Sequence, residues 1–198
     1  MLRHPRSRLA AVLLAATALV AACGDDDEDV SATPGDQEPA SSTTSAAPAG
    51  ETINVVGVDY AFEGLPAEIS VGTKVDFTNG TTANEVHEFV AIRIPDTETR
   101  AVSELVKLPE AEIDAIFGSG PPAAVLVAPP GGAPVITAVG DGTFTQTGRY
   151  AVACFIPTGA DPAEYLAAAQ SAGDEGPPDV KGGPPHVANG MFAEVRVK

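Results

Sequence analysis

Short apolar runs separated by turn residues dominate the chain beyond residue 50. The runs that resemble strands are Ile53–Val58, Glu68–Val71, Lys74–Asn79, His87–Ile94, Pro134–Val139, Arg149–Phe155 and Phe192–Val197. The last run alternates apolar and charged residues from Ala193 to Val197, which predicts one buried and one exposed face, and Met191 shares the buried parity. Short strands at this spacing predict an all-β domain, a sandwich or barrel of antiparallel strands.

Two segments break the β pattern and predict short helices. Pro109 to Phe117 begins with proline, carries acids in its first turn and is followed by Gly118. The run from Ala163 to Ala172 has the same helix start and stop signals, with Asp161 expected as its N-cap. We expect both helices to be insertions in a β framework.

The first 22 residues have the layout of a secretory signal, with Arg3, Arg6 and Arg8 before an apolar run from Leu9 to Ala22. The run ends on Val-Ala-Ala-Cys, which resembles the lipobox of bacterial lipoproteins, in which the cysteine is acylated. We therefore expect residues 1–22 to be removed and Cys23 to carry a lipid at the outer face of the cell membrane. Ordinary secretion with a free Cys23 is the alternative.

Residues 23–50 contain the lipidation site and then an acidic and Ser/Thr/Ala/Pro-rich stretch with almost nothing to bury, which predicts a disordered linker. Its 27 residues after Cys23 would reach on the order of 30 Å. Residues 51–198 are long enough for one globular domain with its own core.

The net charge of the chain limits the classes of binding partner to be expected. Without the signal arginines the chain has 8 basic and 27 acidic residues, a formal net charge of −19. This charge argues against nucleic acid and favours a basic protein partner, or simply a solvated acidic surface. We expect a monomer.

With Cys23 acylated, Cys154 has no disulfide partner in the chain, and a lone exported cysteine needs another explanation.

Soft metal ligands are scarce beyond the signal. Apart from Cys23 they are His87, Cys154, His186 and Met191, which together are the His₂Cys set with an axial Met of a blue-copper site. Each residue alone has a simpler interpretation: a strand-edge histidine, a small buried cysteine, a turn histidine and a core methionine.

The order and spacing of these residues resemble the plastocyanin family of cupredoxins. Gly148-Arg-Tyr-Ala-Val-Ala-Cys154 matches the family's Gly-x-Tyr-x-x-x-Cys, and His186-Val-Ala-Asn-Gly-Met191 matches its His-x-x-x-x-Met. Similar segments upstream are Asp59 to Phe62, Gly72 to Asn79 and Val86 to Phe89.

The resemblance implies a cupredoxin-like Greek-key β-sandwich with short helical insertions. It also implies one type 1 copper ion held by His87, Cys154, His186 and Met191, and one-electron transfer with a redox protein partner.

The chain departs from the family pattern in several places. Residues 155–185 separate Cys154 from His186, which requires the two ends of this insertion to lie close together. Glu88 stands where plastocyanins commonly have asparagine, so the electronics of the site are expected to differ. Val90, Ile92 and Ile94 alternate out of phase with His87, which predicts a bulge or an irregular strand start.

Residues 93–142 have no counterpart in the family's minimal pattern and are expected to form a cap over the metal end or a docking surface.

Two other functions compete with electron transfer. One is a copper-binding or delivery lipoprotein, which His-rich or Met-rich tracts would favour and this chain lacks; the other is a metal-free interaction module. We do not expect an enzyme, because an oxidase cluster needs more histidines and no hydrolytic triad or phosphate loop stands out.

Overall fold

A computed structural model describes residues 50–118, 120–172 and 178–198. The predictions for the signal, for Cys23 and for the linker up to residue 49 lie outside these residues. In the described ranges, every helix is too short or too polar to cross a membrane.

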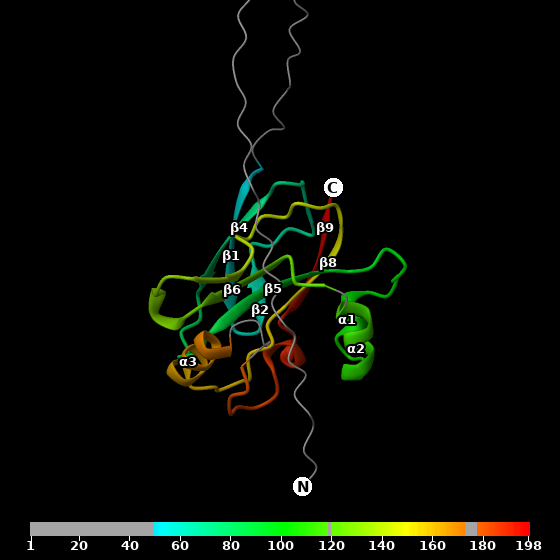
Figure 1. Ribbon diagram of the computed structural model, residues 1–198. Coiled ribbons are helices and arrows are strands. Elements are labelled where there is room, and N and C mark those ends of the chain that lie inside the picture. Colours follow the sequence, from blue (N-terminus) through cyan, green and yellow to red (C-terminus); the bar gives the residue numbers. More distant parts are fainter. Residues whose placement is uncertain (1–49, 119, 173–177) are drawn as a thin grey trace, which may run out of the picture. The chain divides into compact units, whose positions relative to one another are not determined.

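Two sheets form the domain (Figure 1). The smaller has the strand order β2-β1-β4, and the larger has the order β3-β9-β8-β5-β6-β7. The strands are β1 (Thr52–Val58), β2 (Ala61–Glu63), β3 (Glu68–Ile69), β4 (Lys74–Asn79), β5 (His87–Arg93), β6 (Ala124–Ala128), β7 (Ile136–Val139), β8 (Gly148–Ala153) and β9 (Phe192–Val197). This architecture confirms the predicted all-β sandwich with short helices.

Strand direction was predicted incorrectly in two places. β1 pairs in parallel with β4, and β3 pairs in parallel with β9, whereas a wholly antiparallel arrangement was expected. The sequence pattern specifies which residues are extended but not which strands are neighbours, so direction could not be read from it.

The core lies between the two sheets. Its central aromatic group is Phe62 on β2, Phe77 on β4 and Phe89 on β5, with Phe89 in edge-on contact with Phe62 at a ring separation of 5.6 Å. Val195 and Val197 of β9 are buried in the same cluster and Arg196 between them is exposed, as the alternation predicted.

Helices lie on opposite sides of the sandwich (Figure 1). They are α1 (Val102–Leu105), α2 (Glu110–Phe117) and α3 (Pro162–Ala172), with the 3₁₀ turns η1 (Pro130–Gly132) and η3 (His186–Asn189). The predicted N-cap of α3 is confirmed, because the Asp161 carboxylate accepts a 2.9 Å hydrogen bond from the amide of Glu164. α1 was not predicted, since four residues are too few to show a helical period.

Strand β5 is buried on both faces, which corrects the expected bulge. His87, Phe89 and Ala91 face the sandwich interior, and the pairing of β5 with β6 runs without a break from His87 to Ala91. The opposite face is also covered: Ile92 borders an apolar pocket together with α1 and α2, and Glu88 contacts α3. The out-of-phase apolar residues therefore mark a second buried face and no irregularity in the strand.

The stretch 93–142 contributes more than a cap or a docking surface. Besides α1 and α2 it contains β6, which pairs with β5 inside the larger sheet. Its first part is anchored by Arg149, whose guanidinium donates to both carboxylate oxygens of Glu194 and to the carbonyls of Glu98 and Arg100, each at 2.8 Å.

The ends of the 155–185 insertion lie side by side, as the resemblance required. Pro157 and Pro185 form an isolated β-bridge. Thr158 donates two hydrogen bonds to the carbonyl of Pro184, 3.1 Å from its amide and 2.7 Å from its hydroxyl. The insertion therefore leaves and re-enters the sandwich at one place, directly beside the predicted ligands.

Candidate metal centre

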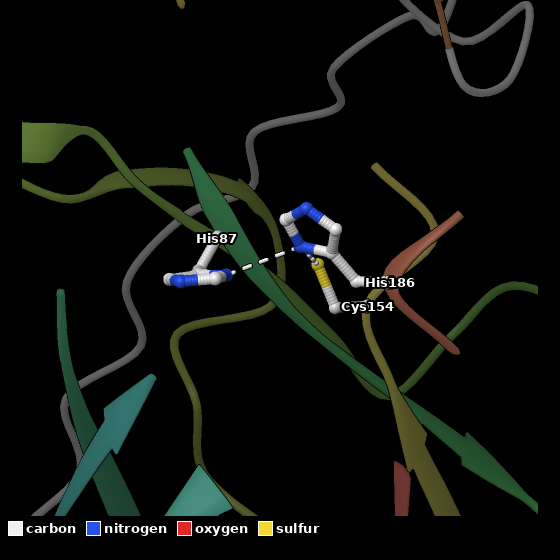
Figure 2. A group of neighbouring side chains, drawn as sticks. All are labelled: His87, Cys154 and His186. Atoms are coloured by element: carbon white, nitrogen blue, oxygen red, sulfur yellow. Dashed lines mark hydrogen bonds between the residues drawn. The ribbon is translucent and has the colours of Figure 1, made fainter. Parts of the chain in front are cut away.

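Three of the predicted ligands meet at one end of the sandwich. His87 begins β5, Cys154 follows the last residue of β8, and His186 begins η3. Figure 2 shows their side chains pointing toward one another from these three segments. All three are buried, with exposed fractions of 1% for His87 and 0% for the other two.

The atoms that converge are the two Nδ1 nitrogens and the thiol sulfur. His87 Nδ1 lies 3.2 Å from His186 Nδ1, and Cys154 Sγ lies 3.3 Å from His186 Nδ1. The ligand atoms of the three residues all lie within 4.8 Å of one another. Two imidazoles and one thiol this close, shielded from water, fit a soft or borderline metal and a type 1 copper ion in particular.

Backbone hydrogen bonds hold the ligand segments together. The amide of Val187 donates to the carbonyl of Cys154 at 2.8 Å, and the amide of His186 donates to Ile156 at 2.9 Å. The turn after η3 passes through Gly190, whose φ of 106° suits glycine. These contacts involve no metal, so the protein itself holds the ligands in position.

Met191, the fourth predicted ligand, is fully buried in the same apolar cluster as Cys154. Its carbonyl accepts a 3.2 Å hydrogen bond from the amide of Cys154, and its amide donates to the carbonyl of His186 at 3.1 Å. Met191 therefore lies next to two of the other ligands along the backbone, while its role as an axial ligand remains a prediction.

Glu88, the departure from the family's asparagine, connects three segments. Its amide donates to Cys154 Sγ at 3.4 Å. Its carboxylate accepts from the amide of Phe155 at 2.8 Å and from the hydroxyl of Tyr165 on α3 at 3.1 Å. Burial raises the pKa of this carboxyl, while both hydrogen bonds act in the opposite direction. Glu88 thus ties the inserted helix to the cysteine loop.

Sequence reasoning missed two residues that shape the centre. Gly57 on β1 leaves room for His87, because a Cβ there would lie 3.1 Å from His87 Cβ and 3.0 Å from Phe77 Cζ. Tyr60 packs edge-on against the His186 ring at 5.2 Å and, in the described part of the chain, is the sole non-glycine residue with a positive φ, 61°. A left-handed tyrosine is strained, and such strain concentrates at functional sites, but sequence alone does not reveal it.

The metal-free ligands are uncharged at neutral pH. Burial, and secondarily the neighbouring His186, lowers the pKa of His87 from 6.5 to about 4. Burial also lowers the pKa of His186, against the effect of Glu85. Burial, together with the charge of Glu88, raises the pKa of the Cys154 thiol to about 12. A metal must therefore displace the thiol proton but finds both imidazoles neutral, each with one ring nitrogen free to bind it.

The depressed pKa of His87 predicts that the metal-free protein loses stability in mild acid. Between pH 6.5 and about 4 the unfolded chain binds a proton that the folded chain excludes, so the free energy of unfolding falls as the pH falls. The expected loss from this group is up to about 3 kcal/mol. Urea denaturation at several pH values measures it, and His87→Gln should remove this part of the pH dependence. An identical pH profile in the variant would show that His87 is not responsible.

Comparisons with known proteins give structural likenesses only. No protein-family model and no curated protein matches the chain. Among solved structures, reduced auracyanin from the photosynthetic bacterium Roseiflexus castenholzii is 21% identical with a TM-score of 0.39, covering 74% of this chain and 96% of that one. Auracyanin B is 15% identical with a TM-score of 0.33, covering 74% and 88%. Auracyanin A from Chloroflexus aurantiacus, described as a "blue" copper protein, is 18% identical with a TM-score of 0.32, covering 52% and 85%.

These likenesses are too distant to assign ligands, and the site rests on the chain's own geometry. Two packed sheets enclose a core, and His87, Cys154 and His186 converge at one end of it through Nδ1, Sγ and Nδ1. The described residues form a two-sheet β domain with a buried His₂Cys cluster that could hold a metal ion.

Proposed function

We propose that this protein is a one-electron carrier with a type 1 copper centre, tethered to the outer face of a membrane by lipid on Cys23. The observation that carries the proposal is the convergence of two buried Nδ1 atoms and one buried Sγ on a single point. His87, Cys154 and His186 would hold the metal, with the Met191 thioether as a fourth, weaker ligand. Copper bound to such a set supplies reversible uptake and release of one electron.

The surrounding residues provide what such a centre needs from a protein. The backbone bonds among Cys154, His186 and Met191 hold the ligand segments in place without a metal, so little rearrangement is required when the charge at the centre changes. Burial of all four side chains keeps water away from the thiol. The Glu88 amide donates to Sγ and helps to stabilise the thiolate once its proton has left.

The partner would be another redox protein. The formal charge of −19 without the signal would attract a basic surface and speed encounter at low salt. Membrane tethering would keep the carrier near membrane-bound donors or acceptors. The charge also argues against nucleic acid as a partner.

Voltammetry of the copper-loaded protein tests this function. We expect a reversible one-electron wave that survives repeated cycling, because the backbone holds the ligand segments in place. Met191→Leu should shift the potential while preserving the wave, since an axial thioether tunes the couple. Release of copper on reduction would contradict the proposal and indicate a storage or delivery protein.

A further inference from the structure

Glu85 lies two residues before His87 and faces the outer nitrogen of the other ligand histidine. Its carboxylate oxygen Oε2 is 3.0 Å from His186 Nε2. The imidazole of His186 is fully buried, whereas the Glu85 side chain is 21% exposed. Nε2 makes no hydrogen bond to any group in the described ranges, and the Glu85 carboxylate is an acceptor 3.0 Å from it.

The carboxylate is held in place from two directions. Its other oxygen, Oε1, accepts a 3.1 Å hydrogen bond from the amide of Gly159, in the insertion that follows Cys154. The backbone of Glu85 is fixed as well, because its carbonyl accepts a 2.8 Å hydrogen bond from the Asn79 side chain on β4. The contact with His186 therefore comes from an anchored side chain and not from a freely moving surface acid.

The chemistry of imidazole gives this contact a role. A neutral histidine carries one ring proton, and His186 can bind a metal through Nδ1 only when that proton is on Nε2. A buried N–H without an acceptor destabilises the tautomer that carries it. Both buried Nε2 atoms lack a completed hydrogen bond in the described ranges, and Glu85 places an acceptor 3.0 Å from that of His186.

We propose that Glu85 is a positioning residue of the metal centre, which fixes the Nε2–H tautomer and the ring orientation of His186 so that Nδ1 faces His87 and Cys154. This inference extends the proposed copper function. A negative charge beside a ligand imidazole also favours the more positive oxidation state of a bound metal. Glu85 therefore affects both the assembly of the site and its potential.

Two variants separate these effects. Glu85→Gln keeps a hydrogen-bond acceptor of similar size but removes the charge, while Glu85→Ala removes both. Glu164→Gln is the matched control, because Glu164 is an exposed acid on α3 and the substitution changes the net charge equally.

The first measurement uses metal-free protein with ¹⁵N-labelled histidine, in which NMR reports the tautomer of each ring. We expect His186 to carry its proton on Nε2 in the wild type and in Glu85→Gln, and to shift toward Nδ1–H in Glu85→Ala. A wild-type His186 protonated on Nδ1, or a tautomer unchanged in Glu85→Ala, would overturn the proposal. This result does not depend on copper binding, so it stands or falls separately from the electron-carrier function.

The second measurement is the potential of the copper-loaded variants. We expect Glu85→Gln to raise the potential, changing the Cu(II)/Cu(I) ratio at a fixed applied potential three- to tenfold, or up to about 59 mV for a one-electron couple. Glu164→Gln should leave the ratio unchanged. Equal potentials in the two variants would contradict the effect of the Glu85 charge on the centre.

Discussion

Replacement of Cys154 by serine is expected to abolish the intense thiolate-to-copper absorption of the Cu(II)-loaded protein while the sandwich remains folded. The thiol is the sole sulfur atom among the three converging ligand atoms, and a serine hydroxyl is a hard and weakly acidic substitute. Visible absorption after addition of Cu(II), with circular dichroism as the check on folding, measures the effect.

The chain offers a matched control in its other cysteine. Cys23→Ser changes the same chemical group at the predicted lipidation site and should leave the absorption intact. Loss of the band in Cys23→Ser, or its persistence in Cys154→Ser, would place the copper thiolate somewhere other than the centre described above.

Phe89→Ala is expected to cause the largest loss of stability, about 3–5 kcal/mol in the free energy of unfolding. Phe89 is fully buried and packs against Phe62 and Phe77, with ring separations of 5.6 and 5.7 Å. Truncation would leave a cavity between the sheets, two residues from His87. Urea denaturation of the metal-free protein gives the free energy, and we expect Tm to fall by roughly 10 °C.

Phe155→Ala is the comparison for this substitution, because the same atoms are removed from a side chain that is 37% exposed. Its loss should be clearly smaller than that of Phe89→Ala, since less area is buried and a partly exposed site leaves no enclosed cavity. Equal losses would mean that the aromatic group between the sheets is not the main source of stability.

The spacing of chemically distinctive residues singled out three side chains that the structure brings together, while their metal and Met191 as a ligand stay predictions. Cys154, His186 and Met191 stand in a recognisable order, and the structure brings His87 and His186 to the thiol. Local sequence patterns also predicted secondary structure correctly: the Asp161 N-cap of α3 and the burial alternation along β9 both occur as predicted.

What the sequence did not reveal depends on contacts between distant segments. The apolar face of Val90 and Ile92 suggested a bulge because coverage of β5 by α1, α2 and α3 was not foreseeable from a local pattern. The parallel pairing of β1 with β4 depends in the same way on the whole fold. Glu85 and Tyr60 acquire roles only because His186, more than a hundred positions away, folds back against them.

The most direct test of the account is a crystal structure of the copper-loaded protein with anomalous diffraction measured at the copper absorption edge. We predict one strong anomalous peak bonded to Nδ1 of His87, Sγ of Cys154 and Nδ1 of His186, with the sulfur of Met191 as a weaker fourth ligand. A peak among surface carboxylates, or no peak at the His₂Cys cluster, would contradict it.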